Sequence, residues 1–484
     1  MSRLAWRAGM MTGAALVSLA GSLPARADTL REALVLAYKT NPTLQAARAT
    51  QRSTDEGVPI ARAPGLPSAS TDATITEYVQ TSQTSFTAPQ RLLTVGGDIG
   101  VPVYSGGAVK NRIAAAKVRV DAGQADLRGS ESTLFSNVVA AYMDVIRGEA
   151  LVGLNHKNVA VLETNLLATQ DRFDIGDVTR TDVAQSQSRL ALARSTARQA
   201  EADLASSRET YIQLVGKVPE DLAPPPPLPN LPTTPEEAVQ VALDSNPDLI
   251  AARKRSEAAN KDIDVAGAGR LPTVRLFASG TYTNYLGTLG GDQSAAFPQT
   301  DRSSQVGAQV SIPIFQGGLP AAQRRQAQAQ ASAALEQEIA AERNVIAQVR
   351  AAYTSWKASL DLIASSQVAV DASTLSLEGV RAENSVGNRT VLDILNAEQE
   401  LLNAQTDLVT ARRNAYVAGF TLLAAMGRAE ARDLNLDGGI LYDPEVNYER
   451  VRGKFMDWGN DPDPVAQSTR TVDTPVQDGN IPSD

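Results

Sequence analysis

The sequence contains no cysteine and only one histidine, His156, in 484 residues. Without cysteine there is no disulfide bond, no thiolate metal ligand, no cysteine nucleophile and no lipid-bearing cysteine at a mature N-terminus. Histidine-dependent acid–base chemistry has a single candidate, and no cluster of partners surrounds His156 in the sequence, so we expect it to face solvent on a helix. These absences argue against an enzyme and against a cofactor or metal site.

Aromatic residues are also scarce, at 5% of the chain, whereas Ala, Gln, Ser and Leu are abundant. This composition is typical of long helices in close contact. The net charge of −9 and the isoelectric point near 5.0 argue against a nucleic-acid partner. Beyond residue 27, no stretch approaches the roughly 18 uninterrupted apolar residues that cross a bilayer as a helix. A membrane-embedded part would therefore be β-structure.

Residues 1–27 have the three parts of a secretory signal peptide. Arg3 and Arg7 make its basic end, residues 9–20 its apolar run, and Ala25-Arg26-Ala27 a small-x-small cleavage site before Asp28. This pattern predicts that the mature protein is exported across the inner membrane.

An internal duplication is the most informative feature that the sequence does contain. Asn41-Pro42 returns 205 residues later as Asn246-Pro247, and the Leu-Pro pairs 66–67 and 271–272 keep the same offset. The pattern Pro-x-aromatic-x-Gly-Gly occurs at 102–107 and again at 313–318. A period this long does not suit a solenoid unit, so we infer that one structural half was duplicated and fused.

Proline is missing from two long intervals, one in each half: 103–218 and 321–443. We expect each interval to form a long helical hairpin, at 108–216 and at 320–430. Gly176 and Gly387 interrupt the helical pattern and mark the turns, and Thr181 or Thr390 follows as an N-cap. An arm of this kind would be on the order of 100 Å long.

The return arm of each hairpin carries apolar and small residues at alternating spacings of three and four, the pattern of a coiled-coil-like seam. A plain amphipathic helix in a bundle is the alternative, and the match between the two halves counts against it. The positions are Val183, Ser186, Leu190, Ala193, Ala197, Ala200, Leu204, Ser207, Tyr211 and Leu214, and Ile394, Ala397, Leu401, Ala404, Leu408, Ala411, Ala415, Ala418, Leu422 and Ala425.

Segments with a period of two lie between the first helix and the hairpin of each half, and they predict strand pairs at 67–104 and 272–315. Four strands cannot close into a barrel alone, and an open sheet in lipid leaves its edge groups unpaired. Either the sheet is a soluble β-cap, or several chains share one barrel. The strands' second face carries small residues (Gly96, Gly100, Gly307, Ser311), which suits a water-lined interior and favours the shared barrel.

The predicted organisation of the chain has five parts. A signal peptide at 1–27 precedes the first repeat at 28–218, which starts with a helix. A proline-rich linker at 219–235 leads to the second repeat at 236–440. The segment 441–484 is polar and contains scattered prolines, and we expect it to be disordered or loosely wrapped.

The ordered, duplicated motifs resemble the TolC family of outer-membrane efflux and secretion channels. They are the Asn-Pro helix opening, the Leu-Pro strand entry, the Gly-Gly strand exit and the Val-Gly-x-Arg-Thr-x-x-Asp-x-Leu turn at 386–395. The resemblance covers roughly residues 28–436. It implies a mainly helical fold with a β-barrel portion: a homotrimer with a twelve-stranded transmembrane barrel in the outer membrane and a long helical tunnel through the periplasm.

The resemblance also implies where the tunnel is gated. Arg389 matches the arginine of the family's turn, Thr181 and Asp182 match its usual partners on the other hairpin, and Asp393 matches one ring of aspartates. The second ring position is Asn396 here, and Asn384 stands where the family often has tyrosine. The turns at Gly176 and Gly387 would dock an adaptor.

The resulting hypothesis is a passive exit duct that serves protein secretion, favoured by the type I-like opening at 30–42, or small-molecule efflux. Its partners would be a periplasmic adaptor, an inner-membrane ABC exporter or proton-driven pump, and outer-membrane lipid. One alternative is a soluble periplasmic coiled-coil adaptor. Another is an enzyme with Asp182 and Asp393 as an acid/base pair, although lone aspartates at helix starts are usually caps.

Overall fold

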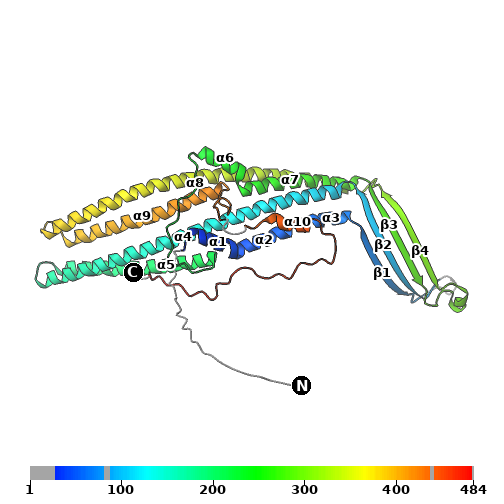
Figure 1. The fold of residues 1–484 in the computed structure, drawn as a ribbon, viewed down its shortest axis with the longest axis horizontal. Helices are drawn as coiled ribbons and strands as arrows, with labels where there is room; N and C mark the ends of the chain where they lie inside the picture. Colours follow the sequence, from blue (N-terminus) through cyan, green and yellow to red (C-terminus); the bar gives the residue numbers. More distant parts are fainter. Residues whose placement is uncertain (1–27, 81–87, 437–440, 482–484) are drawn as a thin grey trace, which may run out of the picture.

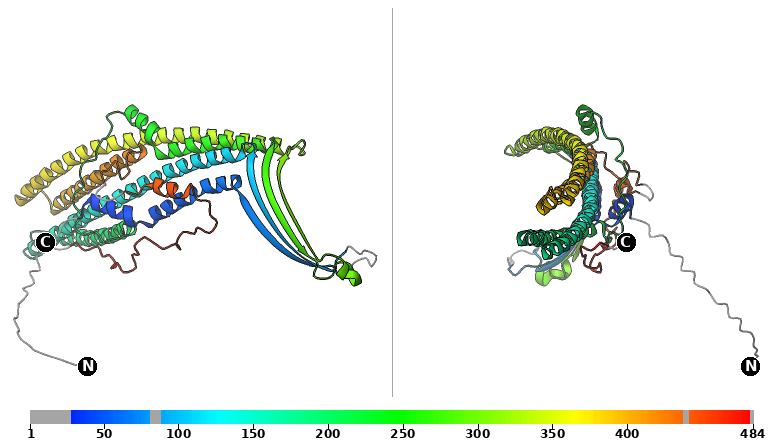
Figure 2. Two further views of the ribbon diagram at one scale, coloured as in Figure 1. Left: turned by 45° about the vertical axis from the view of Figure 1, so that its right-hand side comes forward. Right: turned by 90° about the vertical axis from the view of Figure 1, so that its left-hand side faces the viewer.

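The structure is a computed structural model that describes residues 28–80, 88–436 and 441–481. The predicted signal peptide lies outside the described residues. Long helices form one elongated body, and a single sheet extends from one end of it (Figure 1). Viewed along the body, the helices form an arc with a concave and a convex side (Figure 2). No helix of the described part is long and apolar enough to cross a membrane.

The two halves of the chain contain matching elements in the same order. The first half comprises α1 (Leu30–Thr40), α2 (Pro42–Asp55), α3 (Gly57–Arg62), β1 (Ser68–Glu77), β2 (Arg91–Ser105), α4 (Ala108–Asp174) and α5 (Arg180–Val215). The second comprises α6 (Pro235–Ser245), α7 (Pro247–Gly267), β3 (Thr273–Asn284), β4 (Thr300–Ser311), α8 (Leu319–Ser385) and α9 (Val391–Ala425). The predicted fold class, with duplicated helical hairpins and four strands, is confirmed.

The four strands form one antiparallel sheet in the order β1-β2-β3-β4. Pairing of β2 with β3, for example Val95 opposite Tyr282, joins the strand pair of one repeat to that of the other. A register shift between Pro102 and Tyr104 bends β2 where it approaches α4. The predicted duplication therefore produces a continuous sheet rather than two separate hairpins.

Small buried residues hold the helices close together. Ala193, Ala197 and Leu204 of α5 are buried, as are Ala404 and Ala411 of α9, so the predicted seams do face neighbouring helices. The largest core cluster gathers where α1, α4, α5 and the end of α9 meet, around Phe135, Tyr142 and Tyr211. Alanine at a contact position lets two helix backbones approach closely, which suits a thin wall one helix deep.

Asn41 and Asn246 make equivalent junctions between three helices. The Asn41 N–H donates to Ala37 at the end of α1, and its side-chain oxygen accepts from the first N–H groups of α2. Its amide Nδ2 donates to the carbonyl of Leu214 near the end of α5, at 2.9 Å. Asn246 repeats all three contacts, and its amide Nδ2 donates to the carbonyl of Ala425 at the end of α9, also at 2.9 Å.

These junctions explain how short helices run beside long ones. α4 and α8 have 67 residues each, about 100 Å at roughly 1.5 Å per residue. α5 meets α2 at Asn41, and α9 meets α7 at Asn246, so two shorter helices together match each long helix. Pro42 and Pro247 occupy the first helical position, where a missing N–H costs nothing.

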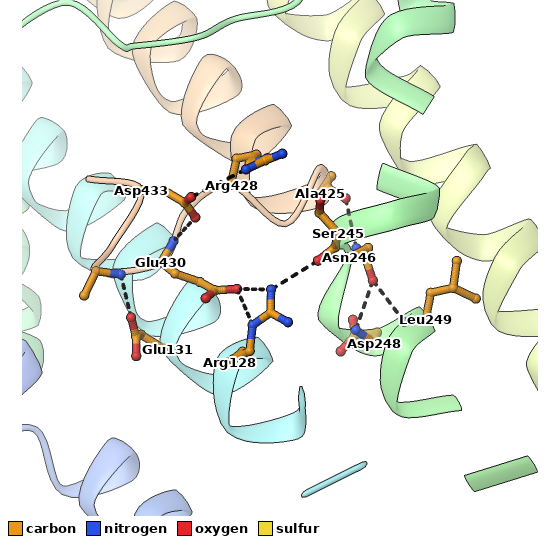
Figure 3. A network of polar contacts seen from close by, with 11 residues as sticks. Arg128, Glu131, Ser245, Asn246, Asp248, Leu249, Ala425, Arg428, Glu430 and Asp433 are labelled. Carbon is orange, nitrogen blue, oxygen red and sulfur yellow. Dashed lines mark hydrogen bonds and ion pairs between the residues drawn. The ribbon is translucent and has the colours of Figure 1, made fainter. Parts of the chain in front are cut away.

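A charged network reinforces the second junction (Figure 3). Arg128 of α4 donates through Nε to the Glu430 carboxylate at 2.8 Å and through Nη2 to the Ser245 carbonyl at 3.4 Å. Glu131, one turn further along α4, accepts from the Ala431 N–H at 2.6 Å. Burial, reinforced by the nearby Glu430 carboxylate, raises the pKa of Glu131 to about 6.

The tail at 441–484, expected to be disordered or loosely wrapped, contains one helix and makes specific contacts with the helical body. Pro444–Val451 forms helix α10, which packs on α2: Asn447 donates to the buried Asp55 carboxylate at 2.7 Å. Further along, Arg208 of α5 donates to the carbonyls of Asp478 and Asn480. The tail is polar because its anchors are hydrogen bonds to buried polar groups, and composition alone does not distinguish this from disorder.

The junctions generate a first prediction. Replacing Asn41 or Asn246 with Asp keeps the oxygen that caps the following helix but removes the amide that reaches the neighbouring helix. Each change should lower the free energy of unfolding by about 1–3 kcal/mol, because it leaves a buried carbonyl without its donor. Urea unfolding of the single and double variants measures this. Asn403→Asp is the control, since the exposed Asn403 oxygen only accepts from Gln399. Equal stability of all variants would contradict the role of the junctions.

A second prediction concerns pH. The folded-state pKa of Glu131 lies above its ordinary value of 4.5, so its stabilising effect is complete below pH 4.5 and is lost as the pH rises through 6. Glu131→Gln, which stays neutral, should raise the free energy of unfolding at pH 7.5 by about 2 kcal/mol and leave it unchanged at pH 4.5. Glu430→Gln, which weakens the partner of Arg128, should instead destabilise at pH 7.5. A pH-independent effect of Glu131→Gln would refute this account.

Candidate functional site

The end of the body opposite the sheet consists of two hairpin turns with the same backbone geometry. Gly176 follows α4 at φ +83° and Gly387 follows α8 at φ +80°. In both turns the glycine N–H donates to the carbonyl three residues earlier, and the next N–H donates to a carbonyl five residues earlier. This is the left-handed C-cap that glycine adopts without strain.

A capping box starts the return helix of each hairpin. Thr179 caps α5 and bonds reciprocally with Asp182, and Thr390 caps α9 in the same way with Asp393. These hydrogen bonds hold the pKa values of both carboxyl groups below their usual range. The expectation that Thr181 is a cap is wrong: Thr179 stands three residues before Asp182, the spacing that a capping box needs, and Thr181 lies exposed inside the first turn of α5.

The other predicted gate residues make contacts within their own hairpin. Arg389 Nε donates to the Glu383 carboxylate at 2.7 Å, and Asn384 Nδ2 donates to the Arg389 carbonyl at 2.7 Å. In the single chain Arg389 therefore pairs with Glu383, and its contact with Thr181 or Asp182 stays a prediction for the assembled trimer. The local pair forms because Glu383, at the end of α8, and Arg389, just before α9, flank the same turn at Gly387, so the flexible arginine side chain reaches the carboxylate.

Contacts a few turns from the tips link the two hairpins, and sequence reasoning missed them. The buried Glu398 of α9 accepts from Asn165 Nδ2 of α4 at 2.9 Å to each carboxylate oxygen, and from Arg381 of α8 at 2.9 Å. Asn396, a predicted gate residue, accepts from Arg189 of α5 at 2.9 Å. Glu398 directly follows the seam residue Ala397, and this position was the only signal in the sequence for its burial.

An apolar cluster lies beside these polar links. Leu395 of α9 packs against Leu162 of α4 and Leu190 of α5, so α9 lies against both arms of the first hairpin. The turns themselves expose Ile175 and Val386 at equivalent positions. The two hairpins are thus linked to each other a few turns from the tips, and the tips themselves expose apolar side chains to solvent in the single chain.

The sole histidine is not part of the tip. His156 is exposed on α4 and its Nε2 lies 2.8 Å from the Glu201 carboxylate of α5. Within residues 28–80, 88–436 and 441–481, no group of three His, Asp or Glu side chains is arranged to hold a metal ion. The tip is built from caps, ion pairs and apolar side chains, which can hold helices together or apart.

A family model described as "Outer membrane efflux protein" matches residues 33–217 and 238–428, one match for each repeat. The chain belongs to this family. Outer membrane efflux protein BepC of Brucella suis is 34% identical over 448 residues, which are 92% of this chain and 95% of the relative. Outer membrane protein TolC of Escherichia coli is 29% identical over 371 residues, 73% of this chain and 74% of the relative.

A more distant relative is the alkaline protease secretion protein AprF of Pseudomonas aeruginosa, 26% identical over 319 residues, or 64% of each chain. Among solved structures, the Campylobacter jejuni CmeC outer membrane channel has a TM-score of 0.73 at 15% identity, and the match covers 88% of this chain and 89% of that one. The similarity to the CmeC structure concerns the fold alone.

Family membership decides between the hypotheses from sequence. The protein is an outer-membrane channel that extends into the periplasm, and the alternative of a soluble periplasmic adaptor is wrong. Members of this family are channels rather than enzymes, form homotrimers, and work with adaptors and inner-membrane pumps.

The link through Glu398 generates a third prediction. Glu398→Ala removes the acceptor shared by Asn165 and Arg381, a loss of about 1–2 kcal/mol once the exposure of Arg381 is allowed for. The two hairpins should then separate more readily, and single-channel conductance in planar bilayers should rise. Glu400→Ala, two residues along the same helix on its exposed side, is the matched control. If both variants conduct like the parent, Glu398 does not restrain the tips.

Proposed function

We propose that three copies of this chain join their sheets into one twelve-stranded barrel in the outer membrane and their helices into a periplasmic tunnel. The observation that carries the proposal is that the sheet of the single chain is open, with two unpaired edges. Strands β1 and β4 are its two edges, and each presents unpaired backbone groups. Edge groups exposed to lipid cost several kcal/mol each, and closure with other copies pairs them all.

The two faces of the sheet support the same arrangement. One face is apolar and exposed, as expected of a surface that contacts lipid. It carries Ile75, Val95, Ile99, Leu276, Val306 and Val310. The opposite face is polar: Arg275 bonds to Asp98 at 2.7 Å and Gln305 to Ser279 at 3.0 Å. A polar face directed inward suits a water-filled passage.

The proposed activity is passive conduction. An inner-membrane transporter would supply the energy, and a periplasmic adaptor would connect it to the tips. We propose exported protein as the cargo, through an ABC exporter of the type I kind, because the opening at 30–42 resembles that branch and AprF is named for protease secretion. Small-molecule efflux with a proton-driven pump is the second candidate, because BepC is named as an efflux protein.

We further propose that the tips form the constriction of the assembled tunnel. Its residues would be Arg389, Thr181, Asp182, Asp393, Asn396 and Asn384, brought together around the trimer axis. Asp393 is bonded to Thr390 in its capping box, and the remaining carboxylate surface of three copies would attract cations. The turns at Gly176 and Gly387, with exposed Ile175 and Val386 beside them, would receive the adaptor.

The cargo is tested in cells that lack this chain, with and without a plasmid that restores it. Loss of secreted protein, without a change in sensitivity to toxic small molecules, supports the secretion duct. The reverse pattern supports efflux and contradicts the proposed cargo. Normal secretion and normal sensitivity together would contradict an export role.

A fourth prediction tests the turns. Valine at both Gly176 and Gly387 meets no steric neighbour but strains the backbone at positive φ, so the turns should reshape while the helices persist. Export should fall several-fold with trimers still formed. The control is valine at Gly153 and Gly379, helical glycines that also have open space around them and no positive φ. Normal export by the Gly176/Gly387 variant would exclude these turns as docking sites.

A further inference from the structure

The residues that follow α10 present a compact group of large apolar side chains to solvent. Phe455 is 69% exposed, Met456 71% and Trp458 94%. Three such side chains within four positions are unusual on a surface that only meets water. They belong to the tail at 441–484, for which the sequence pattern indicates no role.

The direction of the tail places this group at the sheet-bearing end of the helices. Tyr442 stacks on Arg48 in the middle of α2, with the guanidinium 4.8 Å from the ring centre. Asn447 then bonds to Asp55 at the end of α2. Tyr448 packs against a cluster that Val58 and Ala61 of α3 form with two residues of α4. The chain therefore runs parallel to α2 and α3 toward the sheet, and Figure 1 shows the segment after α10 reaching the end of α3 before it turns back.

The cluster that receives Tyr448 lies close to the sheet. It includes Ile113 of α4, and α4 begins at Ala108, directly after β2. Five residues of helix are about 8 Å at roughly 1.5 Å per residue. The loop that carries Phe455, Met456 and Trp458 follows α10 in this direction, toward the level at which the helices become strands.

That level also has the chemistry of a membrane boundary. Tyr104 and Phe315, equivalent residues of the two repeats, are exposed where the chain passes between sheet and helices. Exposed aromatic rings mark the interface between hydrocarbon and water, because an amphipathic ring is stable among lipid headgroups. The apolar face of the sheet starts from the same boundary.

The loop is held firmly at its base. Both oxygens of Asp461 accept from Arg450 at 2.7 Å, and one accepts from Lys454 at 3.2 Å. These two cations hold the pKa of Asp461 well below its usual range. Residues 450–461 thus form a loop that these ion pairs close, with apolar side chains at its tip.

We propose that Phe455, Met456 and Trp458 form an interfacial anchor that inserts into the phospholipid headgroup layer on the periplasmic face of the outer membrane. The inference rests on the proposed embedding of the sheet in that membrane. The anchor sets the depth and tilt of the tunnel relative to the bilayer. Its partner is a phospholipid surface rather than a protein, because the group continues the apolar and aromatic boundary of the sheet.

Tryptophan fluorescence tests the anchor directly. The chain has three tryptophans, and Trp356→Phe leaves Trp458 as the only one beyond the predicted signal peptide. The variant is reconstituted into phosphatidylcholine–phosphatidylglycerol vesicles, with or without brominated acyl chains. The expected result is a blue-shifted Trp458 emission that brominated lipid quenches. Acrylamide in the water should quench this emission less than it quenches the emission of the protein unfolded in denaturant.

A matched control uses another exposed position of the same tail. Val472 is 84% exposed and lies between Thr471 and Thr474, which line a cavity with Asn41 at the junction of α2 and α5. Residues 42–62 separate that junction from the sheet, about 30 Å of helix. Trp356→Phe/Trp458→Phe/Val472→Trp should therefore report water, with acrylamide quenching and no effect of brominated lipid.

Two results would overturn the anchor. Quenching of Trp458 by acrylamide alone, as for the Val472→Trp control, would place the loop in water. Protection from both quenchers would place it against another protein chain. Ion conductance of the same vesicles is measured in parallel: conducting vesicles with an aqueous Trp458 refute the anchor alone, whereas absence of conductance refutes the membrane channel itself.

Discussion

The junction at Asn41, repeated at Asn246, is the interaction on which the tunnel wall depends. A wall of helices about 100 Å long needs continuous packing beside α4 and α8, yet each half of the chain supplies that length in two pieces. One asparagine bonds to the end of the first helix through its backbone N–H, caps the second with its side-chain oxygen and donates its side-chain amide to the end of a third. Because it satisfies backbone groups at three helix ends at once, the wall continues across a break in the chain.

The two junctions are equivalent, but their surroundings are not. The second is braced by Arg128 and Glu430, and it carries the half-buried Glu131, whose charge opposes folding above pH 6. The first is covered by the tail, which anchors at Asp55 and again at Arg208 on either side of it. Duplication thus supplied the common geometry, and each half acquired its own support.

The sequence predicted the parts of the structure that depend on local pattern or on repetition. Glycine at 176 and 387 indicated the turns because only a left-handed residue closes that hairpin, and the alternation of the strands indicated the sheet. Thr179 could have been found as well, since a threonine three residues before an aspartate is a capping box. Thr181 also precedes Asp182, but by one residue rather than by three.

The sequence pattern did not predict side-chain contacts between helices that are far apart in the chain. Glu398 pairs with Asn165 across 233 positions, and Arg208 holds carbonyl groups 270 and 272 positions away, which no periodicity reveals. Arg389 pairs with Glu383 in its own hairpin in the single chain, a partner that the repeated turn pattern does not indicate. A single long side chain reaches several acceptors, and the choice depends on how helices from different repeats are placed.

The central claim is that this chain completes its structure only as three copies around one axis. Native mass spectrometry of the detergent-solubilised mature protein measures this directly. The account predicts a particle of three chains that persists when detergent is stripped in the gas phase. A particle of one or two chains would leave the edges of β1 and β4 unpaired and would contradict the account.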